Sequence, residues 1–162
     1  MPGPYGIAIH VADLVAVLDH VGAAAVLLAG HSMGACVMAL LAAQHPDRAG
    51  VCCCSTPACH SHVPNPVEML ESAVANALMR LGITFRIGRP VRRGRRAHPA
   101  FAHAWDDDID AYARYDIVED GHGARCAASA AAVRADSSDM ILDDATRTAL
   151  DRVRAPVQLL RA

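Results

Sequence analysis

The chain has 162 residues, of which 53% are hydrophobic and 20% charged, and its formal net charge is -2. This length and apolar content suit one globular domain, and the near-neutral charge gives no reason to expect nucleic acid or an anionic membrane as a partner. No signal-peptide pattern opens the sequence, and no apolar stretch reaches the roughly 20 residues that span a bilayer, so we expect a cytoplasmic protein.

The first third of the chain predicts helices that alternate with strands. An apolar stripe at helical spacing indicates a helix over His10–Val21, which Gly22 ends. Residues 24–29 are continuously apolar, as is typical of a strand buried on both faces of a parallel sheet. Met33–Gln44 is apolar on all sides, which predicts a buried helix, and Gly50–Ser55 is a second strand candidate. This order predicts an α/β fold with a parallel sheet.

The rest of the chain predicts a mostly helical insertion before a last strand. Pro156 opens a short apolar run that we expect to be this strand. We therefore divide the chain into an α/β core part at 1–56, a helical insertion at 57–147 and a return to the core at 148–162. Within the insertion, apolar spacing favours helices and an arginine-rich stretch favours a solvated loop: helices over 67–81, 111–118, 127–133 and 144–153, and the loop over 86–96.

A serine lies between two glycines where the first predicted strand meets the buried helix, in the sequence Gly30-His31-Ser32-Met33-Gly34. A sharp strand-to-helix turn strains its central residue, and small neighbours leave room for it. Such a turn exposes the Ser32 hydroxyl and aims the backbone N–H of Met33 at a developing oxyanion. The five-residue pattern alone is weak, but a strand before it and a helix after it are the context that supports a nucleophile.

The segment HVADLVAVLDHVGAAAVLLAGHSMGACVMALLAAQHPDR resembles the centre of the serine α/β-hydrolases, and LDRVRAPVQLLRA resembles their return from a helical cap into the sheet. The resemblance implies a partial α/β-hydrolase fold with Ser32 as nucleophile and the Met33 amide as an oxyanion donor. It also implies a small-molecule ester or related acyl substrate and no cofactor or metal. Serine at this position argues against the haloalkane dehalogenase and epoxide hydrolase branches.

The resemblance also implies elements that we do not find in this sequence. In the family, a carboxylate and then a histidine follow the serine, and several strands precede it. We expect a chain truncated at both ends, with an open edge on the strand before Ser32. Two interpretations remain open: an esterase-like serine hydrolase, or a non-catalytic remnant that binds a ligand or partner through its cap and sheet edge.

Other candidate sites have simpler interpretations. Adjacent strand residues point to opposite faces, so the triplet at 52–54 does not converge on a metal ion with Cys59, His60 and His62. The aspartates at 106–108 and 110 lack the glycine and glutamate of a calcium loop and favour a solvated helix start. We expect His31 to fill space beside the turn.

The cysteine triplet raises a separate hypothesis about the gene. Three consecutive cysteines are unusual in a strand, and one choice of GC-rich codons for residues 51–64 translates, two bases later, as V-L-L-F-D-A-G-V-P-L-A-R-P. This alternative is an apolar strand that ends in aspartate. The nucleotide sequence decides whether the segment is read out of frame.

Overall fold

The structure is a computed structural model and describes residues 3–55, 64–82, 105–119 and 123–160. The chain divides into two compact units, one formed by Met1–Val74 with Arg134–Ala162 and the other by Ala75–Val133. The division at residues 56 and 147 that the sequence suggests stays a prediction. None of the described helices is long and apolar enough to cross a membrane.

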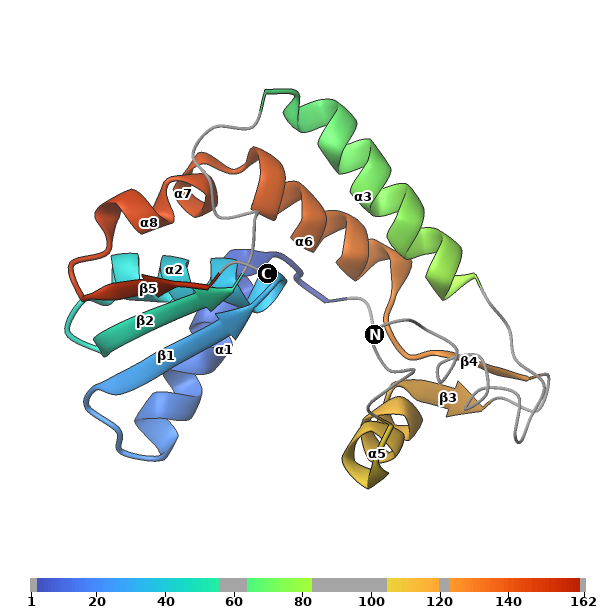
Figure 1. Cartoon of the computed structure of the whole chain (residues 1–162), viewed down its shortest axis with the longest axis horizontal. Helices are drawn as coiled ribbons and strands as arrows, with labels where there is room; N and C mark the ends of the chain where they lie inside the picture. The colour runs from blue at the N-terminus through green and yellow to red at the C-terminus, as the bar shows by residue number, and fades with distance from the viewer. Residues whose placement is uncertain (1–2, 56–63, 83–104, 120–122, 161–162) are drawn as a thin grey trace. The chain divides into compact units, whose positions relative to one another are not determined.

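The first unit contains a parallel three-stranded sheet, as predicted. Its strands are β1 (Val26–His31), β2 (Ala49–Ser55) and β5 (Val157–Leu159), in the order β1-β2-β5 (Figure 1). β1 and β2 align Leu28 with Cys52, and β2 and β5 align Cys52 with Val157. Because all three strands are parallel, their carboxyl ends lie at the same end of the sheet. Among the described strands β1 is at one side of the sheet and has a single neighbour, so it is an edge strand, as expected.

Helix α2 (Met33–Gln44) is the centre of the core and has the bounds that the sequence predicts. It packs against β1 and β2 on one side and contacts α1 (Ile7–His20), α7 (Asp144–Arg147) and α8 (Ala149–Arg152). Its buried side chains form a core cluster with Ile7, Val11 and Leu28 of neighbouring elements. The buried residues of α2 itself are Ala35, Cys36, Val37, Ala39, Leu40, Leu41 and Ala42.

The amino end of α1 is capped by carboxylates from α6 (Ala130–Leu142). The backbone N–H of Gly6 donates to Asp136 Oδ1 at 2.8 Å, and that of Ile7 donates to Asp139 Oδ2 at 3.0 Å. His10 Nε2 lies 3.3 Å from Asp136 Oδ2. Two of the amides that a helix start leaves unpaired are thus satisfied from a distant element.

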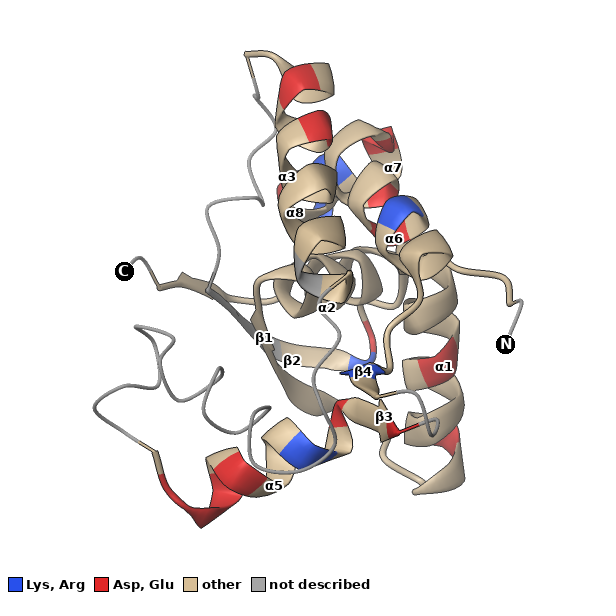
Figure 2. Cartoon of the chain, turned by 90° about the vertical axis from the view of Figure 1, so that its right-hand side faces the viewer, with Lys and Arg blue, Asp and Glu red and all other residues tan. Residues whose placement is uncertain are grey.

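The second unit contains α5 (Asp107–Tyr115) and an antiparallel pair, β3 (Ile117–Glu119) with β4 (Ala124–Cys126). Asp106 caps α5, because its Oδ1 accepts from the N–H of Ile109 at 2.9 Å. Acidic residues follow in the first turn (Figure 2). The aspartate run is a helix start, as the sequence predicts, and residues 106–108 are exposed, but Asp110 is buried and lies 2.6 Å from Arg114 Nη2, so it is not solvated.

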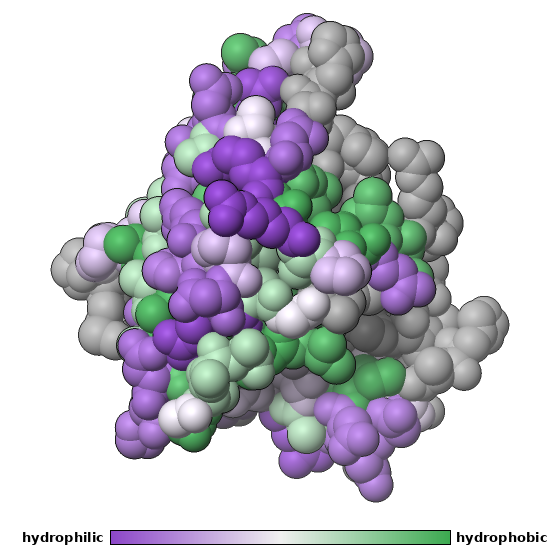
Figure 3. Space-filling model, turned by 90° about the vertical axis from the view of Figure 1, so that its left-hand side faces the viewer, coloured by the Kyte–Doolittle hydropathy of each residue, from purple (hydrophilic) through white to green (hydrophobic). Residues whose placement is uncertain are grey.

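Several expectations need correction. Helix α1 begins at Ile7, three residues before the predicted start, and ends at His20, one residue before the predicted end. The predicted helix 111–118 ends at Tyr115, because β3 pairs with β4 and the N–H of Ala127 bonds to the Asp116 carbonyl. The helix expected at 127–133 begins at Ala130, and the one expected at 144–153 is interrupted at Thr148. The first strand is not buried on both faces, because Leu27 is 78% exposed. Apolar side chains also reach the surface in the space-filling view (Figure 3).

The remaining helix, α3 (Pro66–Leu81), begins one residue before the predicted start and ends where predicted. Asn65 precedes it and accepts from the N–H of Glu68 at 3.3 Å, while its amide donates to the Glu68 carboxylate at 2.8 Å. The first of these bonds satisfies one of the backbone amides that a helix start leaves without a partner in the helix, and the second joins the two side chains. The arginine-rich stretch at 86–96 lies outside the described residues.

Candidate functional site

Ser32 occupies the junction between the carboxyl end of β1 and the first residue of α2. Its backbone angles are φ 53° and ψ -125°, and among the described residues it is the non-glycine residue with positive φ. Such a conformation costs about 1–3 kcal/mol and persists only where the surrounding structure imposes it. The expected strained turn between strand and helix is therefore present, and Ser32 is exposed at it.

Gly30 allows β1 and α2 to meet at this turn. A Cβ built on Gly30 would lie 2.6 Å from the carbonyl carbon of Gly34 and 2.7 Å from Ala35 Cα. Real Cβ atoms do not approach backbone atoms this closely, so a larger residue would push the helix away from the strand. The glycine before the serine is thus required by packing, while its own φ is not positive.

The first turn of α2 offers a place for negative charge. The first N–H groups of a helix have no partner within the helix, and the helix dipole favours an anion there. The Ser32 side chain makes no capping hydrogen bond to α2, while its carbonyl accepts from the N–H of Ala35 at 3.0 Å. The hydroxyl is consequently not used to cap the helix that it precedes.

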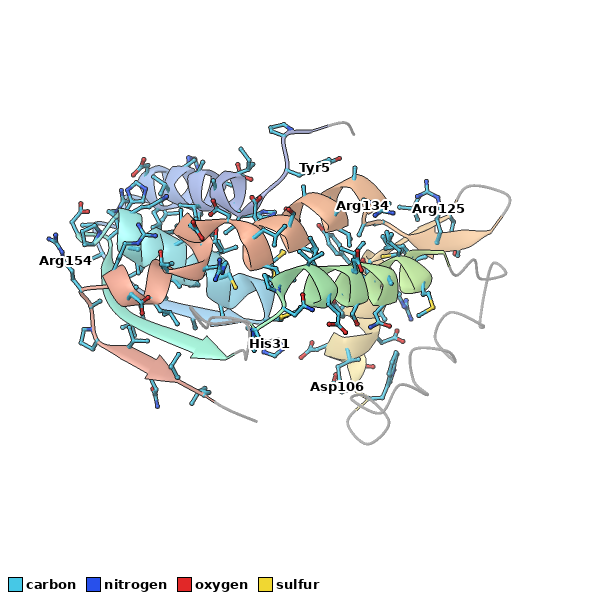
Figure 4. All side chains as sticks on the ribbon, turned by 90° about the horizontal axis from the view of Figure 1, so that it is seen from above. Tyr5, His31, Asp106, Arg125, Arg134 and Arg154 are labelled. Atoms are coloured by element: carbon cyan, nitrogen blue, oxygen red, sulfur yellow. The ribbon has the colours of Figure 1, made fainter. Side chains whose placement is uncertain are left out.

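His31 does not fill a packed space beside the turn, because its side chain is exposed at the end of β1 (Figure 4). No hydrogen bond joins it to Ser32 within the described ranges, and its strand partner on β2 is Ser55. The structure therefore corrects the expectation of a packed His31.

The other candidate residues do not form a described site. Cys52, Cys53 and Cys54 lie on β2, while Cys59, His60 and His62 lie outside the described residues. Where the structure describes the chain, no group of three or more His, Cys, Asp or Glu side chains could hold a metal ion. Sequence reasoning overlooked that Asp136 and Asp139 accept hydrogen bonds from the start of α1. Their spacing of three residues, which places both on one face of α6, was the signal that could have indicated a shared role.

The sequence was compared with protein-family models and with curated proteins. A family model described as alpha/beta hydrolase fold matches residues 2–86, which are 85 of the 162 residues and include Ser32. A search of the curated proteins gave no significant match.

Solved structures with the same fold are longer than this chain. One is the E-2-(acetamidomethylene)succinate hydrolase, which is 20% identical to this chain in sequence and superposes with a TM-score of 0.73. The match covers 97% of this chain and 55% of the hydrolase. The thioesterase domain from the curacin biosynthetic pathway is 16% identical with a TM-score of 0.64, covering 97% and 57%. A hypothetical protein from Pseudomonas aeruginosa PAO1 is 18% identical with a TM-score of 0.62, covering 97% and 56%.

The chain thus spans slightly more than half the length of these solved structures. At such low identities the likeness shows the fold alone, and it agrees with the parallel sheet and the strand–turn–helix unit around Ser32. Because the family model matches just over half of the residues, the chain belongs to the α/β hydrolase fold family.

Proposed function

We propose that this protein hydrolyses a small ester or related acyl compound with Ser32 as its nucleophile. The observation that carries the proposal is the positive φ of Ser32 between a parallel strand and a buried helix. Membership of the α/β hydrolase fold family supports a hydrolase. The nucleophile and the substrate class are our inference from this geometry and from the G-x-S-x-G pattern around it.

The proposed chemistry is acyl transfer to the serine and then to water. Ser32 Oγ attacks the carbonyl carbon, and the carbonyl electrons move onto the oxygen to give a tetrahedral oxyanion. The Met33 N–H at the start of α2 donates to this oxyanion, and the helix dipole stabilises its charge. When the intermediate collapses, the bond from the carbonyl carbon to the leaving oxygen breaks, and this oxygen takes up the proton that Ser32 gave up and leaves as the alcohol. Water then attacks the acyl-serine ester, which releases the acid and restores the Ser32 hydroxyl.

The hydroxyl proton must pass to a base during the attack, because a serine near its ordinary pKa is a weak nucleophile. The family resemblance implies a histidine held by a carboxylate for this role. We assign no residue of this chain to either position. The two groups of this chain to which the proposal gives a catalytic role are the Ser32 hydroxyl and the backbone N–H of Met33.

Hydrolysis of p-nitrophenyl acetate tests the proposal directly. We expect Ser32→Ala to lower the rate by about a thousandfold or more, because no nucleophile remains. Ser138→Ala is the matched control, because it also replaces a serine by alanine but does so on α6, away from the Ser32 turn. Equal rates for the wild-type protein and Ser32→Ala would remove catalysis by Ser32 from the account.

A second candidate function is non-catalytic binding through the sheet. β1 is an edge strand of the described sheet, and Leu27 on it is 78% exposed. Edge strands with exposed apolar side chains readily pair with other polypeptides. This interpretation predicts equal and negligible ester hydrolysis by the wild-type protein and by Ser32→Ala, so the same assay separates the two functions.

A further inference from the structure

We draw no further inference here: the strongest candidate, the apolar surface patch around the exposed Leu27 on the edge strand β1, carries nothing because nothing in the described part of the structure shows what covers it.

Discussion

The two faces of β1 differ sharply although their residues alternate along one short strand. Leu28 faces the core and is 6% exposed, whereas its neighbour Leu27 is 78% exposed. The core-facing side also carries Val26, which packs against the core cluster, and Gly30, which nearly touches α2. Alternation of side chains places Leu27 and Ala29 on the opposite face. One face of the strand thus packs against α2, and this contact together with the pairing of β1 with β2 positions the strand and therefore the turn at Ser32.

The largest effect should come from Gly30→Ala. Its new Cβ would overlap backbone atoms of Gly34 and Ala35, which cannot move away as the end of a flexible side chain could. We expect the free energy of unfolding to fall by about 4 kcal/mol, above the usual cost of overpacking. Urea denaturation followed by circular dichroism measures the change.

Gly50→Ala is the control for this substitution. A Cβ on Gly50 of β2 would lie 3.5 Å from the Val26 carbonyl oxygen, which is an ordinary contact. Its unfolding free energy should stay within about 0.5 kcal/mol of the wild-type value. Equal destabilisation by the two substitutions would show that the close approach of β1 and α2 is not what requires Gly30.

Truncation of the buried leucine should have the next largest effect. Leu28→Ala removes three carbon atoms from the cluster around α2 and leaves a cavity. We expect a loss of about 3 kcal/mol of unfolding free energy. A loss below about 1 kcal/mol, measured in the same denaturation experiment, would contradict the description of this face as part of the core.

The smallest effect should come from the exposed leucine. Leu27→Ala should change the unfolding free energy by less than about 0.5 kcal/mol, because the side chain is already in contact with solvent. The pair Leu28→Ala and Leu27→Ala compares the two faces at adjacent positions. A loss from Leu27→Ala as large as that from Leu28→Ala would mean that the outer face is covered in solution.

Elements whose signals are local could be predicted from the sequence. The bounds of α2 follow from the serine turn before it and from His45-Pro46 after it, and the prediction of Met33–Gln44 is confirmed. The parallel sheet is also confirmed, and so is the place of β1 at its edge among the strands that the structure describes. The strand–turn–helix setting of Ser32 was predictable for the same reason, because two glycines and an apolar run specify it within a few residues.

Features that depend on distant residues could not be predicted in this way. β3 and β4 have three residues each, too few for an alternating pattern, and their pairing depends on partners across the hairpin. The cap on α1 joins Gly6 to Asp136, which is 130 positions away. The exposure of Leu27 was missed because a continuous apolar run carries no sign of which face is covered.

Covalent labelling tests the central claim, that Ser32 is the reactive nucleophile, most directly. The full chain is treated with an alkyl phosphonofluoridate, which reacts with activated serines, and the modified residue is identified by peptide mass mapping. We predict a single adduct on Ser32 that is absent from Ser32→Ala and retained by Ser138→Ala. An unmodified chain, or an adduct that persists on another residue in Ser32→Ala, would contradict the account.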